Sequence, residues 1–381
     1  MILTNQKEYI GVGSIDNIKD VIEKIQAKKI LLVTGKRSYV HCGAKSKIDK
    51  ILNNTYKKQF SQFSVNPKLD DIYLGVQLLK NTKFDLVIAV GGGSVIDMAK
   101  LITILSVQKD GKLTKYIDNN VLITEKGLPL VAIPTTAGTG SEATHFSAVY
   151  VDNIKHSLSH NFMLPNYVII DPELSYNLPS NIAAASGIDA LSQAIESYWS
   201  IKSTQESKIF ASKAIILILK VLKNAVSGDK RSKIEMSKAA YLSGKAINIT
   251  TTTAPHAISY PITIYFGLQH GHAVSLTLGY FFEINYNFQD SDVVDPRGCE
   301  YVKSVMEELY NMFDVSSALE CKNKWHSLID EIGLKRGIKS SGGLASYEVD
   351  KIVDNVNLQR LSNHPVIVSK DKIRMILSNY E

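Results

Sequence analysis

The sequence predicts an α/β domain followed by an all-helical domain, and three observations support this prediction. The chain has 381 residues, too long for one ordinary core and suited to two domains of about 150–200 residues each. Short apolar runs alternate with helix-like stretches up to Asp171 and Pro172. Beyond that point the chain consists of long periodic stretches rich in Ala, Leu, Ile, Lys and Glu, with few strand signals. We therefore expect domains at residues 1–177 and 178–381.

Strands and helices of the first domain follow from its hydrophobic pattern. Four nearly continuous apolar runs lie at residues 29–33, 84–90, 130–133 and 167–170. Such runs are typical of parallel strands that are buried on both faces. Helix-like segments lie between them, at residues 15–25, 46–52 and 69–79. The alternation predicts an open parallel sheet with crossover helices.

Composition excludes several classes of protein. Apolar residues make up 45% of the chain and charged residues 21%, which is typical of a globular protein. The net charge of +6 is spread along the chain without a basic block, so we expect no nucleic-acid partner. No uncharged apolar stretch is long enough for a membrane span, and the first residues lack the pattern of a secretory signal. We therefore expect a cytoplasmic protein with no membrane partner. The three scattered cysteines favour neither a disulfide framework nor a zinc finger.

Two loops carry the first functional signal. The sequence Gly91-Gly92-Gly93-Ser94 follows a predicted strand and opens a predicted helix at residues 95–104. Glycines let phosphates approach the backbone, and a helix start favours negative charge. A second loop, residues 134–142, also follows a buried strand and combines hydroxyls with glycines. Two such loops at adjacent strand ends favour a dinucleotide crevice over two structural turns.

At this point the sequence resembles the iron-containing (group III) alcohol dehydrogenase family. The segments that carry the resemblance span essentially the whole chain: residues 91–100, 134–142, Pro165, Asp171 with Pro172, residues 187–190, His256, His270 and residues 363–365. The resemblance implies a Rossmann-like N-terminal domain and an all-α C-terminal domain, as in dehydroquinate synthase. It implies a metal-assisted, NAD(P)-dependent oxidoreductase that works in a cleft between the domains. Relatives commonly dimerise through their N-terminal strands, so we expect a homodimer.

The resemblance also implies which residues bind the dinucleotide. Besides the Gly91–Ser94 turn, they are Asp97, Lys100, Thr135, Thr136, Thr139, Ser141 and Lys155. For Asp97 and Lys100 the alternative is a surface ion pair between positions i and i+3.

Residues 35–38 favour NADPH over NADH. NAD-preferring relatives commonly carry an Asp at the position of Gly35, where it would bond the ribose and repel a 2′-phosphate. Here Lys36, Arg37 and Ser38 follow Gly35, and two cations with a hydroxyl suit a phosphate. The alternative is an ordinary basic loop.

The metal ligands implied by the resemblance are Asp189, Gln193, His256 and His270, although the family usually carries a histidine at the position of Gln193. Asp189 and Gln193 are one helical turn apart and share a face. One carboxylate and two imidazoles suit Fe2+ with open positions for substrate, with Zn2+ or another divalent metal as alternatives. The Gln193 amide oxygen is a weaker donor than an imidazole, so we expect weaker metal binding than in relatives with four ligands.

Two residues near these ligands are candidates for proton transfer. Tyr260 stands where relatives often have a histidine, and His272 is an additional imidazole two residues beyond His270. Either side chain could relay the alcohol proton. The alternative is that Tyr260 packs in the core and His272 faces solvent.

The predicted reaction is the reduction of a small aldehyde to a primary alcohol. Residues 189–199 and 251–261 look like the phosphonoacetaldehyde reductase branch, which makes 2-hydroxyethylphosphonate in phosphonate biosynthesis. Residues 251–253, Lys155 and His272 are candidate donors to a phosphonate. The alternatives are a reductase of uncharged aldehydes such as butanal or lactaldehyde, a lyase of the dehydroquinate synthase type, and a non-catalytic nucleotide-binding protein.

Overall fold

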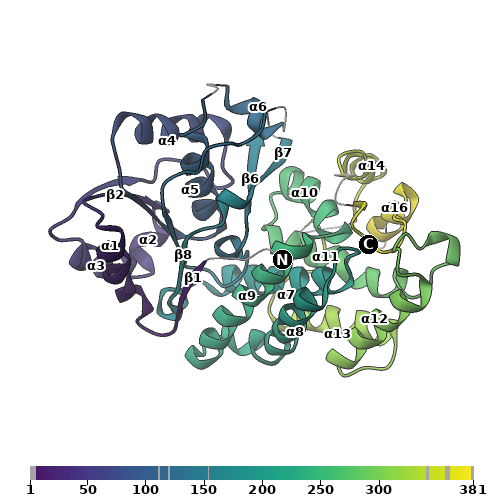
Figure 1. Ribbon diagram of the computed structural model, residues 1–381. Helices are drawn as coiled ribbons and strands as arrows, with labels where there is room; N and C mark the ends of the chain where they lie inside the picture. Colours follow the sequence, from purple (N-terminus) through teal and green to yellow (C-terminus); the bar gives the residue numbers. More distant parts are fainter. Residues whose placement is uncertain are drawn as a thin grey trace. The chain divides into compact units, whose positions relative to one another are not determined.

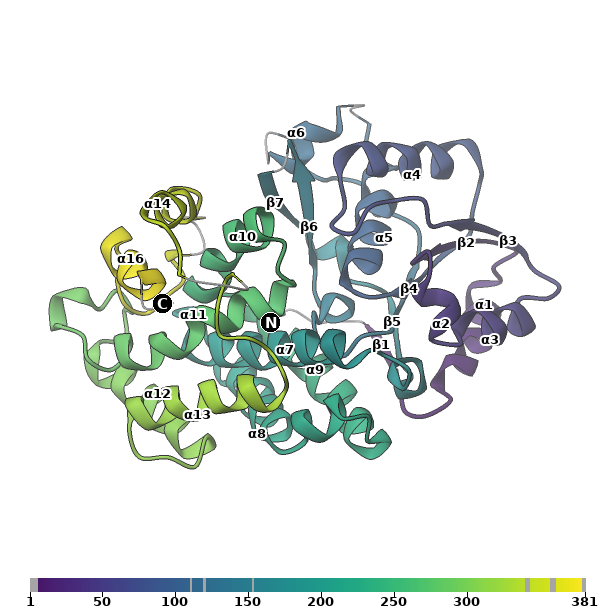
Figure 2. The same ribbon diagram turned by 180° about the vertical axis from the view of Figure 1, so that it is seen from behind.

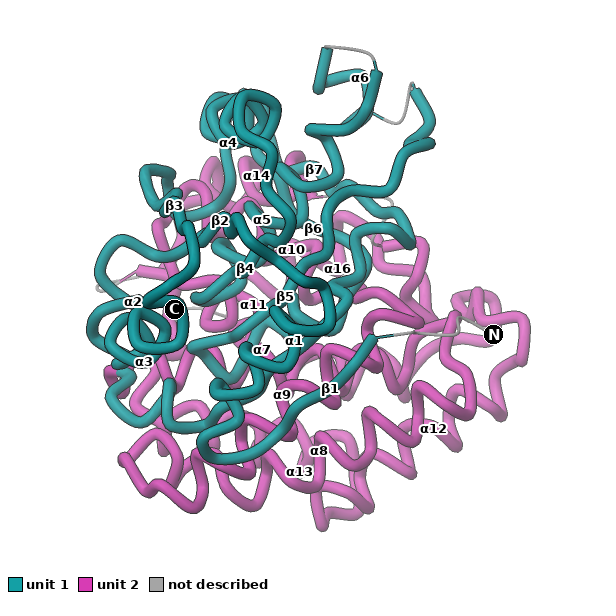
Figure 3. Tube along the Cα trace, turned by 60° about the vertical axis from the view of Figure 1, so that its left-hand side comes forward, with its two compact units in different colours: residues 1–178 teal, residues 179–381 magenta. Residues whose placement is uncertain are grey.

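The computed structural model describes residues 6–109, 112–118, 121–152, 154–339, 343–356 and 361–378. The chain divides into two compact units, Met1–Leu178 and Pro179–Glu381 (Figure 3). Among the described residues, no helix has both the length and the apolar character that crossing a bilayer requires.

Unit 1 is built on a six-stranded sheet with the strand order β1-β8-β5-β4-β2-β3. Every pairing in this sheet is parallel. Its strands are β1 (Lys7–Ile10), β2 (Lys29–Thr34), β3 (Tyr56–Phe60), β4 (Leu86–Gly91), β5 (Leu130–Pro134) and β8 (Tyr167–Ile170). An antiparallel pair, β6 (Phe146–Val151) and β7 (Ile154–Ser159), follows β5.

Helices cover both faces of this sheet, which explains why its central strands are apolar throughout. They are α1 (Ile18–Ile25), α2 (Ser38–His41), α3 (Ala44–Ile51), α4 (Leu69–Asn81), α5 (Gly93–Leu105) and α6 (Leu113–Ile117). Successive strand residues belong to opposite cores: Leu31 and Val33 pack in the core that includes residues of α4 and α5, whereas Ile30 and Leu32 pack with residues of α1 and α3. The two groups of helices lie on opposite sides of the sheet (Figure 1). The predicted α/β architecture is thus confirmed.

Unit 2 is helical. Its helices are α7 (Ser180–Trp199), α8 (Gln205–Val226), α9 (Lys230–Thr250), α10 (Ala254–Phe266), α11 (His270–Ile284), α12 (Cys299–Met312), α13 (Ala318–Glu331), α14 (Ser346–Asp354) and α16 (Lys370–Ser378). Helix α7 packs against α8, α9 and α11 (Figure 2).

Helix α7 is buried on all sides over its last turns, as expected for a helix at the centre of a bundle. It nevertheless carries buried polar side chains, among them Asp189, Gln193 and Glu196. Buried polar groups are costly unless they are hydrogen-bonded or bind a ligand. Their partners therefore define the functional part of this unit.

Candidate cofactor and metal sites

The turn between β4 and α5 consists of glycines that lie against the second loop. A Cβ atom added to Gly93 would lie 2.7 Å from Thr139 Oγ1, and one added to Gly92 would lie 3.4 Å from Thr136 Oγ1. The Thr135 N–H donates a 3.0 Å hydrogen bond to the Gly91 carbonyl. The structure thus brings the two predicted loops together at the carboxyl ends of neighbouring strands.

The start of α5 suits a phosphate group. Its first turn has neither a capping side chain nor an acidic residue, and N–H groups at a helix start carry partial positive charge. Ser94 adds a hydroxyl there, whose oxygen accepts a 3.1 Å hydrogen bond from the Asn66 N–H.

Lys100 lies beneath the second loop. Its side chain is buried, with 1% of its surface exposed. The ammonium donates to Ser141 Oγ at 3.2 Å, to Thr144 Oγ1 at 3.0 Å and to the Phe146 carbonyl at 3.0 Å. Burial lowers the pKa of Lys100 to about 8. Lys100 therefore holds the loop in place and is not a member of a surface ion pair.

Asp97 binds the same loop from the preceding turn of α5. Its carboxylate accepts hydrogen bonds from the Ser141 hydroxyl and, at 3.1 Å, from the Ala148 N–H. Burial raises the pKa of Asp97, and the nearby charges of Lys100 and Lys155 oppose that effect. Two polar residues on one face of α5 thus fix the position of Ser141.

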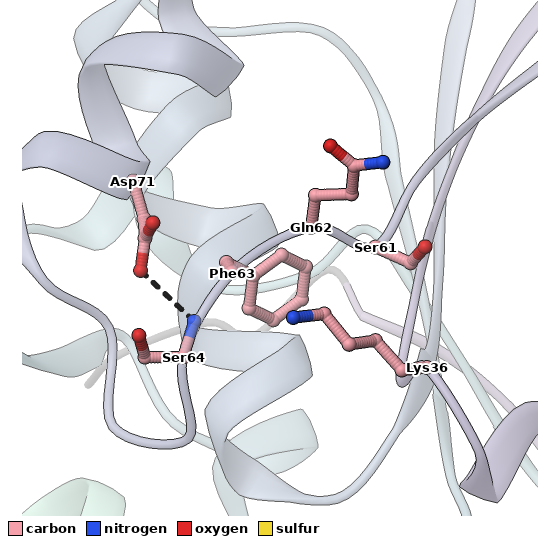
Figure 4. Close-up of a pocket in the computed structure, with 6 residues that line it drawn as sticks. All are labelled: Lys36, Ser61, Gln62, Phe63, Ser64 and Asp71. Atoms are coloured by element: carbon pink, nitrogen blue, oxygen red, sulfur yellow. Dashed lines mark hydrogen bonds between the residues drawn. The ribbon is translucent and has the colours of Figure 1, made fainter.

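A pocket of about 480 Å3 opens beside the carboxyl ends of β2 and β3. It is lined by Lys36, Ser61, Gln62, Phe63, Ser64 and Asp71 (Figure 4). The Asp71 carboxylate accepts a 2.9 Å hydrogen bond from the Ser64 N–H, and the Lys36 side chain extends towards the ring of Phe63 (Figure 4). The pocket offers one cation, two hydroxyls, an amide, an aromatic ring and the Asp71 carboxylate, which accepts the hydrogen bond of the Ser64 N–H.

Of the four residues predicted at the end of β2, Lys36 lines this pocket, while Arg37 and Ser38 are exposed at the start of α2. Residues 61–64, which also line the pocket, were not among the residues predicted from the sequence. Because β3 lacks an apolar run, no strand was predicted there, and the loop after it carried no signal.

In unit 2, three predicted metal ligands converge from three helices. Asp189 of α7, His256 of α10 and His270 of α11 each place a ligand atom within 4.8 Å of the other two. His256 Nε2 lies 3.3 Å from Asp189 Oδ1, and the two imidazole rings meet edge to face at 5.2 Å between centroids. Two nitrogens and one carboxylate form a donor set that fits a divalent transition metal.

The charges around His256 favour a cation. Burial alone lowers the pKa of this imidazole, but the carboxylates of Glu196 and Asp189 outweigh it and raise the pKa to about 10. The same two carboxylates that hold this buried proton would also stabilise a divalent metal ion, which could take the place of the proton.

Gly271 allows the three helices to come this close. A Cβ atom at this position would lie 2.0 Å from the Ala185 carbonyl oxygen and 2.5 Å from Asp189 Cβ. Any other residue would push the start of α11 away from α7, and His270 with it. Gly271 is therefore required for His270 to lie close to Asp189.

Gln193 lies beside the cluster and donates to it. Its Nε2 gives a 3.2 Å hydrogen bond to Asp189 Oδ2, and its Oε1 accepts from the Ser243 hydroxyl at 3.4 Å. In this arrangement the amide orients Asp189. Turning the amide by 180° would present its oxygen to the cluster instead.

Glu196 is a member of this region that the sequence reasoning missed. One of its carboxylate oxygens faces His256 Nδ1 and the other accepts from Thr253. A usable signal was present, since Asp189, Gln193 and Glu196 are spaced as i, i+4 and i+7 on one helix face. Thr253, predicted as a phosphonate donor, is buried and bonded to Glu196.

The two proton-transfer candidates lie differently. Tyr260, one turn after His256 on α10, stacks on the His270 ring with 5.8 Å between centroids and an angle of 23°. His272 Nε2 lies 2.6 Å from the Lys335 carbonyl oxygen. The structure brings Tyr260 against the candidate ligand His270, whereas His272 is hydrogen-bonded to Lys335.

Comparison with known proteins agrees with this geometry. Residues 5–172 match the model of the iron-containing alcohol dehydrogenase family, and residues 183–380 match that of the family's C-terminal domain. The chain belongs to the iron-containing alcohol dehydrogenase family. Members of this family are oxidoreductases that bind NAD(P) and a metal and act on alcohols or aldehydes.

Individual members of the iron-containing alcohol dehydrogenase family differ in substrate. Long-chain-alcohol dehydrogenase 1 of Geobacillus thermodenitrificans is 34% identical over 97% of this chain and 93% of its own length. Phosphonoacetaldehyde reductase of Streptomyces viridochromogenes is 34% identical over 63% of each chain. The structure of sulfoacetaldehyde reductase from Bifidobacterium kashiwanohense in complex with NAD+ superposes with a TM-score of 0.88 at 28% identity, covering 99% of this chain and 97% of that one.

Proposed function

We propose that the protein is an NADPH-dependent reductase that converts a small aldehyde to a primary alcohol with the help of a divalent metal. The observation that carries this proposal is the convergence of Asp189, His256 and His270. A cation held there supplies a Lewis acid for the carbonyl oxygen, and the nicotinamide supplies the hydride. Unit 1 is the dinucleotide-binding domain, and unit 2 carries the metal and substrate sites.

The metal in this proposal is Fe2+, which two histidines and a carboxylate suit well. With its amide turned by 180°, Gln193 would be a weak fourth ligand through its oxygen. Replacing Gln193 by His should therefore raise metal affinity by on the order of tenfold, about 1.4 kcal/mol. Competition with a chelator, using Zn2+ and anaerobic Fe2+, measures this change. His270→Ala is the matched loss-of-ligand variant, and unaltered affinity in that variant would contradict the ligand assignment.

The cofactor in this proposal is NADPH. The backbone of residues 91–94 and the hydroxyls of Thr135, Thr136 and Thr139 receive the phosphates, and Lys36 receives the 2′-phosphate. Support comes from the absence of a carboxylate at Gly35 and from the Lys36 ammonium in a pocket with Ser61 and Ser64.

Tyr260 is the group that relays the proton to the product. It lies against a ligand histidine, whereas His272 is bonded to the Lys335 carbonyl. A phenol hydroxyl can donate a proton and recover it from water.

The substrate in this proposal is phosphonoacetaldehyde. Two of the relatives described above are named for two-carbon aldehydes with an anionic group, a phosphonate in one and a sulfonate in the other. The second candidate is an uncharged aldehyde, which the similarity to a long-chain-alcohol dehydrogenase favours.

A panel assay separates these substrates. NADPH oxidation is followed with phosphonoacetaldehyde, sulfoacetaldehyde, lactaldehyde and butanal, and repeated with NADH. We expect kcat/KM for phosphonoacetaldehyde to exceed that for butanal by at least about tenfold, equivalent to about 1.4 kcal/mol. A preference for lactaldehyde or butanal would replace the phosphonate assignment by the second candidate. Absence of turnover with every aldehyde by metal-loaded protein would overturn the reductase proposal.

A further inference from the structure

Glu196 is the most deeply buried carboxylate of α7, with none of its surface exposed. It lies two helical turns beyond Asp189 and is not one of the three residues of the metal cluster. Burying a carboxylate costs free energy of folding unless hydrogen bonds or an opposite charge offset the loss of hydration. The contacts of Glu196 indicate what role it has in the fold.

One oxygen of Glu196 is fixed by a single residue. Oε2 accepts from the Thr253 N–H at 2.5 Å and from the Thr253 hydroxyl at 2.8 Å. The hydroxyl oxygen in turn accepts a 2.9 Å hydrogen bond from Trp199 Nε1. Two donors on one oxygen leave the carboxylate with a single rotamer, so the position of the other oxygen is fixed as well.

The second oxygen of Glu196 faces His256 Nδ1 at 2.5 Å. Because the Glu196 carboxylate already acts as the acceptor towards both Thr253 donors, we assign the imidazole N–H as the donor of this contact. When His256 has a single ring proton, that proton is on Nδ1, and the lone pair is on Nε2. Nε2 is the atom that lies 3.3 Å from Asp189 Oδ1, inside the cluster.

We propose that Glu196 is a positioning residue that fixes the tautomer and the ring orientation of His256 for metal binding. The inference rests on the proposed metal site. A hydrogen bond from the remote N–H of a ligand histidine to a carboxylate orients the ring and increases its basicity as a ligand. Thr253 precedes α10, and His256 lies in its first turn, so the same carboxylate also connects the start of α10 to α7.

The experiment is the replacement Glu196→Gln in the full-length protein. If the glutamine oxygen keeps accepting from Thr253, the glutamine NH2 group faces His256 Nδ1. Nδ1 must then accept a hydrogen bond, so the single ring proton moves to Nε2, the atom proposed to bind the metal. If the amide turns, the NH2 group meets the two Thr253 donors instead. Either arrangement should weaken Zn2+ binding by about 10- to 100-fold, measured by chelator competition. The visible absorption of bound Co2+ reports the ligand geometry independently of activity.

Asp295→Asn is the matched control. Asp295 is also a buried carboxylate of unit 2, but it pairs with Arg297 at 2.6 Å. This variant should lose stability and keep the Zn2+ affinity and Co2+ spectrum of the wild type. If Glu196→Gln does not fold, Thr253→Val removes one donor to the same carboxylate with little change in shape, and should weaken Zn2+ binding several-fold.

The outcomes separate the two proposals. Wild-type protein that binds no Zn2+ would overturn the proposed function, and the role of Glu196 with it. Wild-type protein that binds Zn2+, together with Glu196 and Thr253 variants that bind it equally well with the same Co2+ spectrum, would overturn the role of Glu196 alone.

Discussion

Three ionisable side chains lie close together at the second loop of unit 1: Asp97 and Lys100 of α5, and Glu142 of the loop itself. Lys100 is 1% exposed and Glu142 is 4% exposed. Burial disfavours the charged form of both, so it lowers the pKa of Lys100 to about 8 and raises that of Glu142 to about 7. These groups surround the loop with the candidate phosphate-binding hydroxyls. Their charged forms lower the free energy of unfolding, because burial deprives them of hydration.

This arrangement predicts a pH dependence of stability. Glu142 has a pKa of 4.5 when exposed and about 7 when folded. Between these values the folded protein keeps a proton that the unfolded chain releases, so the free energy of unfolding falls as the pH rises from 4.5 to 7. Glu142→Gln cannot ionise and should lack this fall. The full effect is on the order of 3 kcal/mol.

Urea unfolding of wild type and variant across this pH range measures the difference. Glu23→Gln, at an exposed position of α1, controls for the loss of one negative charge. Wild-type and Glu142→Gln stabilities that change in parallel with pH would show that Glu142 is not held neutral.

Sequence patterns identified some of the site residues and not others. Asp189, His256 and His270 were named because they match a family motif, and the structure places them together; that they bind a metal remains a prediction. That Lys100 lies next to the dinucleotide also remains a prediction; its burial and its bonds to the second loop exclude only the alternative of a surface ion pair. The depth of a side chain depends on how distant segments pack, and the local charge pattern does not contain that information.

At the scale of elements, the strands that the sequence revealed are those buried on both faces. β2, β4, β5 and β8 appear as apolar runs and were predicted. β1 and β3 were missed because they are the two edges of the sheet, with mostly exposed or half-buried residues. An edge strand needs few apolar side chains, so its hydrophobic pattern is weak.

The backbone conformation of the turn between α9 and α10 could not be predicted from the hydrophobic pattern of the sequence. Thr251 has a φ of 59° and a ψ of −178°, a backbone conformation that a β-branched residue rarely adopts. Asn363 stabilises this turn, because its Nδ2 donates to the Thr250 carbonyl, the Thr251 hydroxyl and the Thr252 carbonyl. The geometry around Thr253 and His256 thus depends on a segment more than 100 residues away in sequence.

At the scale of the whole molecule, two compact units divide the proposed chemistry between them. The glycine turn, the second loop and the Lys36 pocket lie in unit 1, whereas the metal cluster and Glu196 lie in unit 2. Compact units with cores of their own can be stabilised separately by ligands that bind one of them.

Hydrogen exchange followed by mass spectrometry tests this division. Zn2+ should slow the amide hydrogen exchange of α7, α10 and α11, because one ion would link side chains of all three helices. Adenosine 2′,5′-bisphosphate, which carries the 2′-phosphate of NADPH, should protect residues 35–38, 61–64 and 91–94. At 100 times the Kd, amides that exchange by unfolding of the liganded unit should slow by about 100-fold. His270→Ala should remove the Zn2+ effect and leave the nucleotide effect. Zn2+ protection centred on β4 and α5 would instead place the metal in unit 1 and contradict the assignment of the two sites.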